Sequence, residues 1–492
     1  MQLGRALIMN TKTLTLLTDL YELTMMQGYF KNSSNDMVVF DVFYRNNPNK
    51  NGYSIACGLE QVIDYIKNLS FSTSDIEYLS SLNIFDADFL SYLENFKFKG
   101  DIYAIPEGTV VFPKEPILKV IAPIMEAQLV ETAILNIINH QSLIATKAAR
   151  VVYAAKGDGI LEFGLRRAQG PDAGIYGARA AMIGGCVGTS NVLAGKLFGV
   201  PISGTHAHSW IMSFNDEYTA FKKYAHMYPN ACILLVDTYD TLSSGVPNAI
   251  KVFTEMQQMG ITSKVYGIRL DSGDLAYLSK KARKMLDNAG FTDAIISASS
   301  DLDEYLIDSL KTQGAKINSW GVGTNLITSK DCPAFGGVYK LAAIKEQGSD
   351  DFTPKIKVSE NSVKITNPGN KTIFRIYDKE TGKIRADLIS LANETFDETQ
   401  DMIIFDPIDT WKKTKIEGGS YTLRELLVPI FKDGNCVYTS PSVMDIRNFC
   451  LNELNTLWDE TKRLVNPHSV YVDLSDKLFK LKKELLEKIS KY

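Results

Sequence analysis

The sequence predicts an α/β fold with a barrel or a doubly wound sheet of parallel strands at its centre. Six short apolar runs recur between residues 160 and 323, and a helical pattern follows each of the first five. Polar residues and glycines stand where these runs end. Short apolar runs that alternate with helical patterns are typical of buried parallel strands joined by crossover helices.

The expected strands and helices alternate in order along this region. The strands are predicted at 160–163 (ILEF), 200–203 (VPIS), 232–237 (CILLVD), 264–271 (KVYGIRLD), 294–300 (AIISASS) and 317–323 (INSWGVG). The helices are predicted at 172–196, 217–227, 247–259, 274–288 and 301–313. Asn215 and Asp216 are suitable caps for the second helix, because such side chains accept hydrogen bonds from its free backbone N–H groups.

The rest of the chain predicts two further domains, since 492 residues are too many for one simple core. We expect an N-terminal α+β domain at 1–150, the barrel at 151–345, and a C-terminal extension at 346–492 that packs on both. In the first domain we expect helices at 14–30, 58–69, 74–95 and 126–155, and strands at 37–45, 102–113 and 116–122. In the extension we expect a polar linker at 346–351 and strands at 355–365, 371–378 and 383–391.

The last residues predict a terminal helix with one apolar stripe. The stripe consists of Leu474, Leu478, Leu481, Leu485 and Ile489, with lysines on the opposite face. Such a stripe favours a helix that is docked on the protein over a membrane anchor.

Composition narrows the class of protein. Fifty-three basic and 57 acidic residues give a net charge of −4, which argues against nucleic-acid binding driven by bulk charge. The six cysteines are scattered without a Cys-x-x-Cys pair, which suits a reducing compartment better than a disulfide framework or a zinc knuckle. No apolar run is long enough to span a membrane, and the start is too short for a signal peptide. We expect a cytoplasmic protein, with Met9 as an alternative start.

Chemically useful residues gather at the ends of the expected strands. They are Arg166 and Arg167, Thr205 and His208, Asp237 and Asp240, then Arg269, Asp271 and Asp274, Ser299, Ser300 and Asp301, and finally Gly321, Gly323 and Thr324. In a barrel all of these strand ends meet on one face, where such enzymes carry their active sites. The clustering therefore predicts an active site there.

This face combines groups that bind anions with groups that bind cations. The glycine-rich turns 321–324 and 184–190 could cradle a phosphate, although such turns are often only turns. Arg166 and Arg167 could clamp a phosphate or form exposed ion pairs. Asp237, Asp271 and Asp274 would suit Mg²⁺ bound to a substrate phosphate, while Asp274 could equally cap the next helix. The mixture makes phosphoryl or phosphoribosyl chemistry plausible.

Two of the five histidines form the pair His206-Ala207-His208, for which three interpretations remain open. A zinc site would need further histidines at later strand ends, but His140 and His226 lie in predicted helices and His468 lies near the C-terminus. A nucleophilic or phosphorylated histidine is the second interpretation. Simple packing is the third.

Six motifs, taken together and in order, resemble the nicotinate phosphoribosyltransferase family. They are LLTDLYELTM (16–25), EFGLRRAQGPDA (162–173), GTHAHSWIMSF (204–214), LVDTYDT (235–241), GIRLDSGDL (267–275) and GVGTN (321–325). The resemblance implies an irregular TIM-like barrel of the type II phosphoribosyltransferases and a homodimer with its active site near the interface. It also implies formation of nicotinate mononucleotide and diphosphate from nicotinate and phosphoribosyl diphosphate. This is the first step of NAD synthesis from nicotinate.

The resemblance further implies roles for individual residues. His208 matches the histidine that is phosphorylated by ATP, which would place the enzyme among the ATP-dependent ligases. Tyr21, Thr205 and Arg269 match the pyridine site, and a guanidinium suits a carboxylate substrate. Arg166 is expected near the base and the diphosphate. Gly323 and Thr324 are expected to bind the phosphoribosyl phosphate. Asp237 and the catalytic Asp271 are expected near the ribose and the metal–diphosphate. Mg²⁺ is the expected cofactor, with ligands that the sequence does not identify.

Two rival functions deserve a test. Nicotinamide phosphoribosyltransferases share the fold and the histidine, but they carry an Asp where this chain has Ser190. The uncharged Ser190 would not repel a carboxylate, so nicotinate is the expected substrate. A metal-dependent barrel hydrolase would instead require tightly bound zinc.

Overall fold

The computed structural model describes residues 14–32, 35–261, 263–361, 364–409 and 411–489, so Met9 lies outside the described residues. The chain forms two compact units. Unit 1 contains Met1–Leu143 and Ala334–Tyr492, and unit 2 contains Ile144–Pro333. The expected N-terminal domain and C-terminal extension thus fall largely in one unit, and the expected barrel falls largely in the other.

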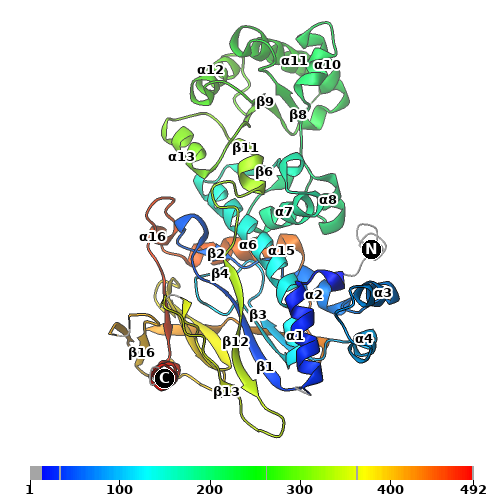
Figure 1. The fold of residues 1–492 in the computed structure, drawn as a ribbon. Helices are drawn as coiled ribbons and strands as arrows, with labels where there is room; N and C mark the ends of the chain where they lie inside the picture. Colours follow the sequence, from blue (N-terminus) through cyan, green and yellow to red (C-terminus); the bar gives the residue numbers. More distant parts are fainter. Residues whose placement is uncertain (1–13, 33–34, 262, 362–363, 410, 490–492) are drawn as a thin grey trace. The chain divides into compact units, whose positions relative to one another are not determined.

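Unit 2 is built on a six-stranded sheet in the order β7-β6-β11-β10-β9-β8 (Figure 1). The strands are β6 (Gly159–Glu162), β7 (Gly188–Thr189), β8 (Cys232–Leu235), β9 (Tyr266–Leu270), β10 (Ile295–Ala298) and β11 (Ser319–Val322). Every ladder between them is parallel. The prediction of an α/β class with parallel strands is confirmed. Within the described residues no ladder joins the edge strands β7 and β8, so the sheet is a half-barrel.

The helices of unit 2 follow the strands as the alternating pattern predicts. They are α7 (Pro171–Ile183), α8 (Val192–Phe198), α9 (His208–Met212), α10 (Glu217–Met227), α11 (Val246–Gln258), α12 (Leu275–Asn288), α13 (Glu304–Thr312) and α14 (Thr324–Ile327). Asp216 caps α10 as expected, because its carboxylate accepts a hydrogen bond of 2.8 Å from the Thr219 N–H.

Two predictions in this region are wrong. The expected helix at 172–196 breaks after Ile183, because Gly184 and Gly185 turn the chain and Gly185 has a φ of 112° that favours glycine. The short strand β7 and helix α8 follow this break. The expected strand at 200–203 is reduced to one bridge between Thr189 and Ile202, since β7 takes the place beside β6.

Unit 1 contains two larger sheets and one small one. The first sheet has the order β13-β12-β1-β5-β3-β19-β20, and the second has the order β17-β16-β21-β15-β14-β18, while β2 pairs with β4. The first sheet consists of β1 (Met37–Tyr44), β3 (Asp101–Ala104), β5 (Leu118–Pro123), β12 (Gly337–Lys345), β13 (Thr353–Pro354), β19 (Val428–Lys432) and β20 (Asn435–Cys436). Because β12 pairs with β1 and β19 pairs with β3, the two ends of the chain share one core.

The second sheet comes entirely from the C-terminal part of the chain. It consists of β14 (Lys371–Asp378), β15 (Ile384–Leu391), β16 (Met402–Phe405), β17 (Lys413–Ile416), β18 (Tyr421–Glu425) and β21 (Tyr471–Leu474). The small sheet pairs β2 (Ser54–Ile55) with β4 (Val110–Val111). The predicted strands at 371–378 and 383–391 are thus confirmed, to within one residue. The predicted strand at 355–365 is wrong, because its described residues form no strand.

Several expected helices of unit 1 are divided into shorter ones. The first is a 3₁₀ turn at Leu14–Leu16 followed by α1 (Leu20–Lys31), and α2 (Leu59–Lys67) matches its prediction. The expected helix at 74–95 is α3 (Thr73–Ser81) and α4 (Ala87–Glu94), because Asn83 has a left-handed φ of 57°. The expected helix at 126–155 is α5 (Ile124–Leu129) and α6 (Glu131–Ala154).

The C-terminal helices are α15 (Val443–Thr456), α16 (Asp459–Lys462) and α17 (Asp476–Ile489). In α17 Leu478 is buried as expected, but Lys482 is buried too, at 7% exposure. Leu474 is buried in β21, before the helix begins. Among the described residues no helix is both long and apolar enough to cross a membrane.

A buried histidine fastens the chain before α9 to the central sheet of unit 2. The His206 side chain is almost inaccessible, and its Nε2 accepts a hydrogen bond of 3.3 Å from the Leu235 N–H at the end of β8. Its ring packs edge-on against Tyr224 of α10, with centroids 4.6 Å apart. Burial, together with the nearby positive charge of Arg269, lowers the pKa of His206 to about 4. His206 is therefore a neutral packing residue.

This burial predicts a pH-dependent stability. An unfolded histidine takes up a proton near pH 6.5, whereas folded His206 resists protonation down to about pH 4. Its contribution is therefore complete above pH 6.5 and is lost as the pH falls toward 4. The variant His206→Gln keeps an acceptor for the Leu235 N–H but does not titrate. Between pH 7 and 4 the wild type should lose about 3 kcal/mol more unfolding free energy than the variant. Urea denaturation at four pH values measures this, and parallel losses would contradict it.

Candidate active site

The predicted site residues of unit 2 lie at the carboxyl ends of its parallel strands. Asp237 follows β8, Arg269 is near the end of β9 with Asp271 directly after it, and Ser299 follows β10. Thr205 lies in the segment that His206 fastens to β8, and His208 begins α9. Parallel strands bring these ends to one edge of the sheet, as predicted.

Arg269 connects three of these segments. Its Nη1 donates to Thr205 Oγ1 at 2.6 Å and to the His206 carbonyl at 3.3 Å. Its Nε donates to Ser299 Oγ at 2.9 Å, and its Nη2 donates to Asp271 Oδ1 at 3.1 Å. The side chain is only 16% exposed. Four of its five N–H groups are thus engaged, and the second N–H of Nη2 has no partner among the described residues.

Asp237 is the second centre of the cluster. Its Oδ2 accepts hydrogen bonds from the Asp271 N–H at 2.8 Å and the Ser272 hydroxyl at 2.7 Å. Its Oδ1 lies 3.3 Å from His208 Nε2. Asp237 is almost fully buried, whereas the His208 side chain is 40% exposed. A buried carboxylate therefore holds an accessible imidazole in a defined orientation.

The contact with Asp237 also distinguishes the two nitrogens of His208. A carboxylate accepts a hydrogen bond, so Nε2 is the nitrogen that carries a proton. Nδ1 has no hydrogen-bond partner among the described residues. In the neutral imidazole, the lone pair of Nδ1 is consequently available for attack on an electrophile.

Asp271 carries one engaged and one open carboxylate oxygen. Its Oδ1 accepts hydrogen bonds from Arg269 and from the Ser299 hydroxyl. Its Oδ2 has no partner among the described residues, and the side chain is 29% exposed. An open carboxylate oxygen beside a guanidinium can accept a proton donor or contribute one ligand to a divalent cation.

The other predicted residues of unit 2 lie at the ends of β6 and β11. Arg166 is in a 3₁₀ turn, Leu165–Arg167, and its exposed side chain forms no ion pair with a described residue. Gly323 and Thr324 connect β11 to α14, and both are half-buried. No hydrogen bond joins these three residues to the Arg269 cluster in the part of the chain that the structure describes.

Tyr21 is the one predicted site residue in unit 1. It lies on α1 with 45% of its surface exposed, and burial and nearby Glu131 raise its pKa. Next to it, Glu22 is fully buried and binds the Thr132 N–H at 2.9 Å. Burial raises the pKa of Glu22 to about 7, so this carboxyl titrates near neutrality.

Some strand-end residues prove to be structural. Asp240 accepts hydrogen bonds from the Ser243 N–H at 2.7 Å and the Leu242 N–H at 3.1 Å, and so caps a π-helical turn. Asp274 caps α12 through the Tyr277 N–H at 2.9 Å. In the run 184–190, Gly184 packs so closely on Ala145 that a Cβ would lie 2.3 Å from its carbonyl oxygen. This turn has a packing role.

Sequence reasoning missed one buried acid near the site. Glu162 ends β6 and accepts hydrogen bonds from the Thr189 hydroxyl at 2.6 Å and from the Gly164 N–H. Burial raises its pKa. It thereby orders the turn that leads to Arg166. The sequence did offer one indication of this role, because Glu162 is an acidic residue at the end of an apolar run.

Family models match nearly the whole described chain. The model of the nicotinate phosphoribosyltransferase N-terminal domain matches residues 16–139, the family model matches 159–375, and the C-terminal domain model matches 370–482. These matches cover both compact units and every predicted site residue.

Curated relatives and solved structures agree with these models. Nicotinate phosphoribosyltransferase of Bacillus subtilis is 46% identical over 97% of this chain and 96% of its own length. The human enzyme is 30% identical over 94% of this chain and 95% of its own. The crystal structure of human nicotinic acid phosphoribosyltransferase superimposes with a TM-score of 0.82 at 29% identity, over 96% of this chain and all of that one. Nicotinate-nucleotide pyrophosphorylase from Pyrococcus furiosus, 23% identical with a TM-score of 0.67 over 92% of this chain and 98% of its own, shares the fold. This chain therefore belongs to the nicotinate phosphoribosyltransferase family.

Proposed function

We propose that this protein transfers the phosphoribosyl group of phosphoribosyl diphosphate to the ring nitrogen of nicotinate. The products are nicotinate mononucleotide and diphosphate, and the reaction begins NAD synthesis from nicotinate. Family membership supports this activity. The structural observation that carries it is the largely buried Arg269 guanidinium at the sheet edge, whose Nη1 binds the Thr205 hydroxyl and whose Nη2 keeps one N–H without a partner among the described residues.

Arg269 and Thr205 would select the carboxylate of the substrate. A carboxylate in this position would accept a charge-assisted hydrogen bond from the open Nη2–H, and a second bond would replace one present partner of the guanidinium. Tyr21 would stack on the pyridine ring, contributed by the partner subunit of a homodimer. Thr324, Gly323 and Arg166 would bind phosphate groups of the second substrate.

The chemical step needs no protein nucleophile at carbon. The pyridine nitrogen attacks C1′ while diphosphate leaves, through a transition state with oxocarbenium character. The chain contributes alignment of the two substrates and stabilisation of the charges that develop. Asp237 and Asp271, which lie at adjacent strand ends, would face the ribose and the positive charge that forms on it.

Mg²⁺ is the proposed cofactor, and Asp271 fits a role in holding it. No group of three or more His, Cys, Asp or Glu side chains is placed to bind a metal among the described residues. Mg²⁺ usually takes only one or two carboxylates and completes its shell with water and substrate phosphates, so the open Oδ2 of Asp271 is sufficient protein chemistry. The bound ion would neutralise the departing diphosphate.

ATP is the proposed co-substrate, which places the enzyme in the ATP-dependent ligase class. Nδ1 of His208 would attack the γ-phosphoryl group of ATP, the bond to the β,γ-bridging oxygen would break, and ADP would leave, while Asp237 stabilises the proton that remains on Nε2. A phosphoryl group on His208 would add negative charge beside the cations of the site. Attack of water on the phosphohistidine would break the P–N bond, release orthophosphate and return His208 to its free state.

The nicotinamide-specific alternative is not favoured. Position 190 carries a serine, whose backbone N–H donates to the Glu162 carbonyl at 3.0 Å. A carboxylate at position 190 would repel an anionic substrate, and the serine does not. The cytoplasmic location expected from the scattered cysteines stays a prediction; all six cysteines are free thiols.

The substrate assignment can be tested directly. The purified protein is supplied with phosphoribosyl diphosphate and either nicotinate, nicotinamide or quinolinate, with and without ATP. Mononucleotide should form from nicotinate, and ATP should increase its yield. Formation of product from nicotinamide but not from nicotinate would overturn the proposal.

Removal of the reactive imidazole should separate phosphorylation from transfer. In His208→Ala the acid-labile phosphate from γ-labelled ATP should disappear, and the stimulation by ATP should be lost. The exposed His226 of α10 provides a matched control, and His226→Ala should be labelled like the wild type. Equal labelling of His208→Ala and the wild type would remove His208 from this role.

Arg269→Lys keeps the positive charge but cannot reproduce the planar set of contacts. We expect the KM for nicotinate to rise about tenfold to a hundredfold, because charge-assisted hydrogen bonds of about 1.5–3 kcal/mol are lost. The KM for phosphoribosyl diphosphate, measured in the same assays, should change much less. Equal increases in both constants would indicate a general disturbance of the site.

A further inference from the structure

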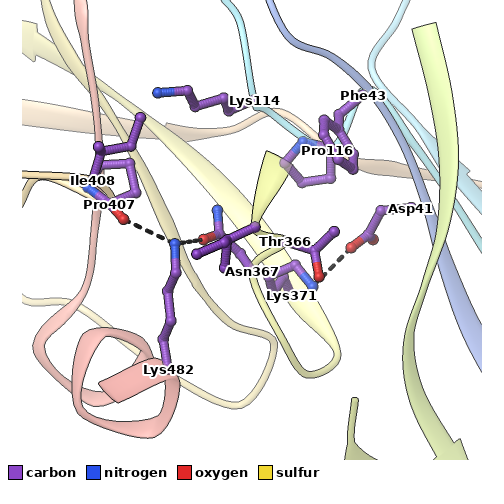
Figure 2. Close-up of a pocket in the computed structure, with 11 residues that line it drawn as sticks. Asp41, Phe43, Lys114, Pro116, Thr366, Asn367, Lys371, Pro407, Ile408 and Lys482 are labelled. Carbon is purple, nitrogen blue, oxygen red and sulfur yellow. Dashed lines mark hydrogen bonds and ion pairs between the residues drawn. The ribbon is translucent and has the colours of Figure 1, made fainter. Parts of the chain in front are cut away.

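A second cluster of charged side chains surrounds a hollow within unit 1. Its walls come from β1, from the segment between β4 and β5, from the segment before β14, from the loop after β16, and from α17 (Figure 2). The hollow contains about 460 Å³ outside protein atoms, counting its open mouth. The lining includes Lys114, Lys371 and Lys482 and a single acid, Asp41. We call these four residues the lysine pocket; three ammonium groups and one carboxylate give its lining a charge of +2.

The two buried lysines have only part of their hydrogen-bonding capacity satisfied. Lys482 is 7% exposed, and its Nζ donates to Asn367 Oδ1 at 2.8 Å and to the Pro407 carbonyl at 2.9 Å. Lys371 is 2% exposed, and its Nζ donates to the Gly369 carbonyl and to Asp41 Oδ2, both at 2.7 Å. Each ammonium has three donors, so each retains one without a partner among the described residues.

Lys114 is the open member of the lysine pocket. Its ammonium forms no hydrogen bond or ion pair with a described residue, and Figure 2 shows it without a contact to the other residues drawn. Its backbone is held at a φ of 76°, a left-handed conformation that is unfavourable for lysine. The Lys114 N–H is fixed to the Tyr44 carbonyl at 2.7 Å. Strained residues of this kind often occur at ligand sites.

The charges around the pocket are not balanced by direct contacts. Asp406, Asp409 and Asp473 attract Lys114, but none forms an ion pair with it within the described residues. Burial raises the pKa of Asp473 to about 6. Burial, together with repulsion from Lys114 and Lys371, lowers the pKa of Lys482 to about 8. Mutual repulsion of buried ammonium groups costs free energy, and a bound anion would offset that cost.

We propose that the lysine pocket binds a phosphate group through the free donors of Lys114, Lys371 and Lys482. Among the described residues five N–H donors have no partner, three on Lys114 and one on each of the others, and their three side chains line a hollow whose lining charge is +2. A phosphate offers several acceptor oxygens and up to two negative charges, which matches this set. The group can belong to free orthophosphate or to the end of a larger molecule such as diphosphate or ATP.

The variant Lys114→Gly tests the proposal without endangering the fold. Glycine adopts a φ of 76° freely, so removal of this side chain should preserve or raise the stability of the chain. Lys50→Gly is the matched control, because Lys50 is exposed, has a φ of 54° and lies outside the lysine pocket. Lys482→Met is a second variant, which removes a buried charge but keeps the length of the side chain.

Binding is measured by calorimetric titration of the full chain with orthophosphate, diphosphate or ATP, at an ionic strength held constant with sodium chloride. The wild type and Lys50→Gly should bind at least one of these ligands at a site that Lys114→Gly and Lys482→Met weaken tenfold or more. If the two variants lose binding of orthophosphate, the ligand is the free ion. If they lose only binding of diphosphate or ATP, the ligand is the terminal phosphate of a larger molecule. Phosphate bound at the sheet edge of unit 2 would survive in all variants. Equal binding by all four proteins would overturn the proposal.

Discussion

The site depends on two buried charges that hold separate strand ends together. Arg269 joins the segment before α9 to the ends of β9 and β10, and Asp237 joins the end of β8 to Asp271 and His208. Both side chains are largely withdrawn from water, so their hydrogen bonds are not weakened by competition with solvent. Parallel strands bring their ends to one edge, but these two residues set the spacing of the reactive groups at that edge.

Burial gives the two histidines different roles. His206 accepts a backbone hydrogen bond and stays neutral inside the unit, whereas His208, two residues later, has an exposed ring that Asp237 orients. The spacing H-x-H alone left a metal site, a phosphorylated histidine and simple packing open as interpretations. The two histidines differ because His206 packs into the unit from the segment before α9, whereas His208 is the first residue of that helix. The buried, neutral His206 thus fixes the segment from which the exposed His208 projects.

Much of the fold could be read from the sequence because apolar periodicity reports burial. Five of the six expected strands of unit 2 are present, and the strand-end positions of Asp237, Arg269 and Asp271 follow from them. The errors have local causes: Gly184 and Gly185 end a helix whose pattern continues past them, and VPIS is apolar without being a full strand. The contacts of Glu162 and the buried position of Lys482 could not be predicted, since each depends on residues distant in sequence.

The whole of unit 2 is inserted between two parts of unit 1, and this order has a consequence for synthesis. β1 cannot pair with β12 until residue Lys345 has emerged, about 300 residues after Met37. At about 5–20 residues per second, the ribosome needs roughly 15–60 s for that length. During this time β5 can already pair with one edge of β1, but the edge that β12 takes has no final partner, while unit 2 can already complete its own core. The nascent chain therefore exposes the unpaired edge of its first strand, β1, throughout this time, and a chaperone would bind there.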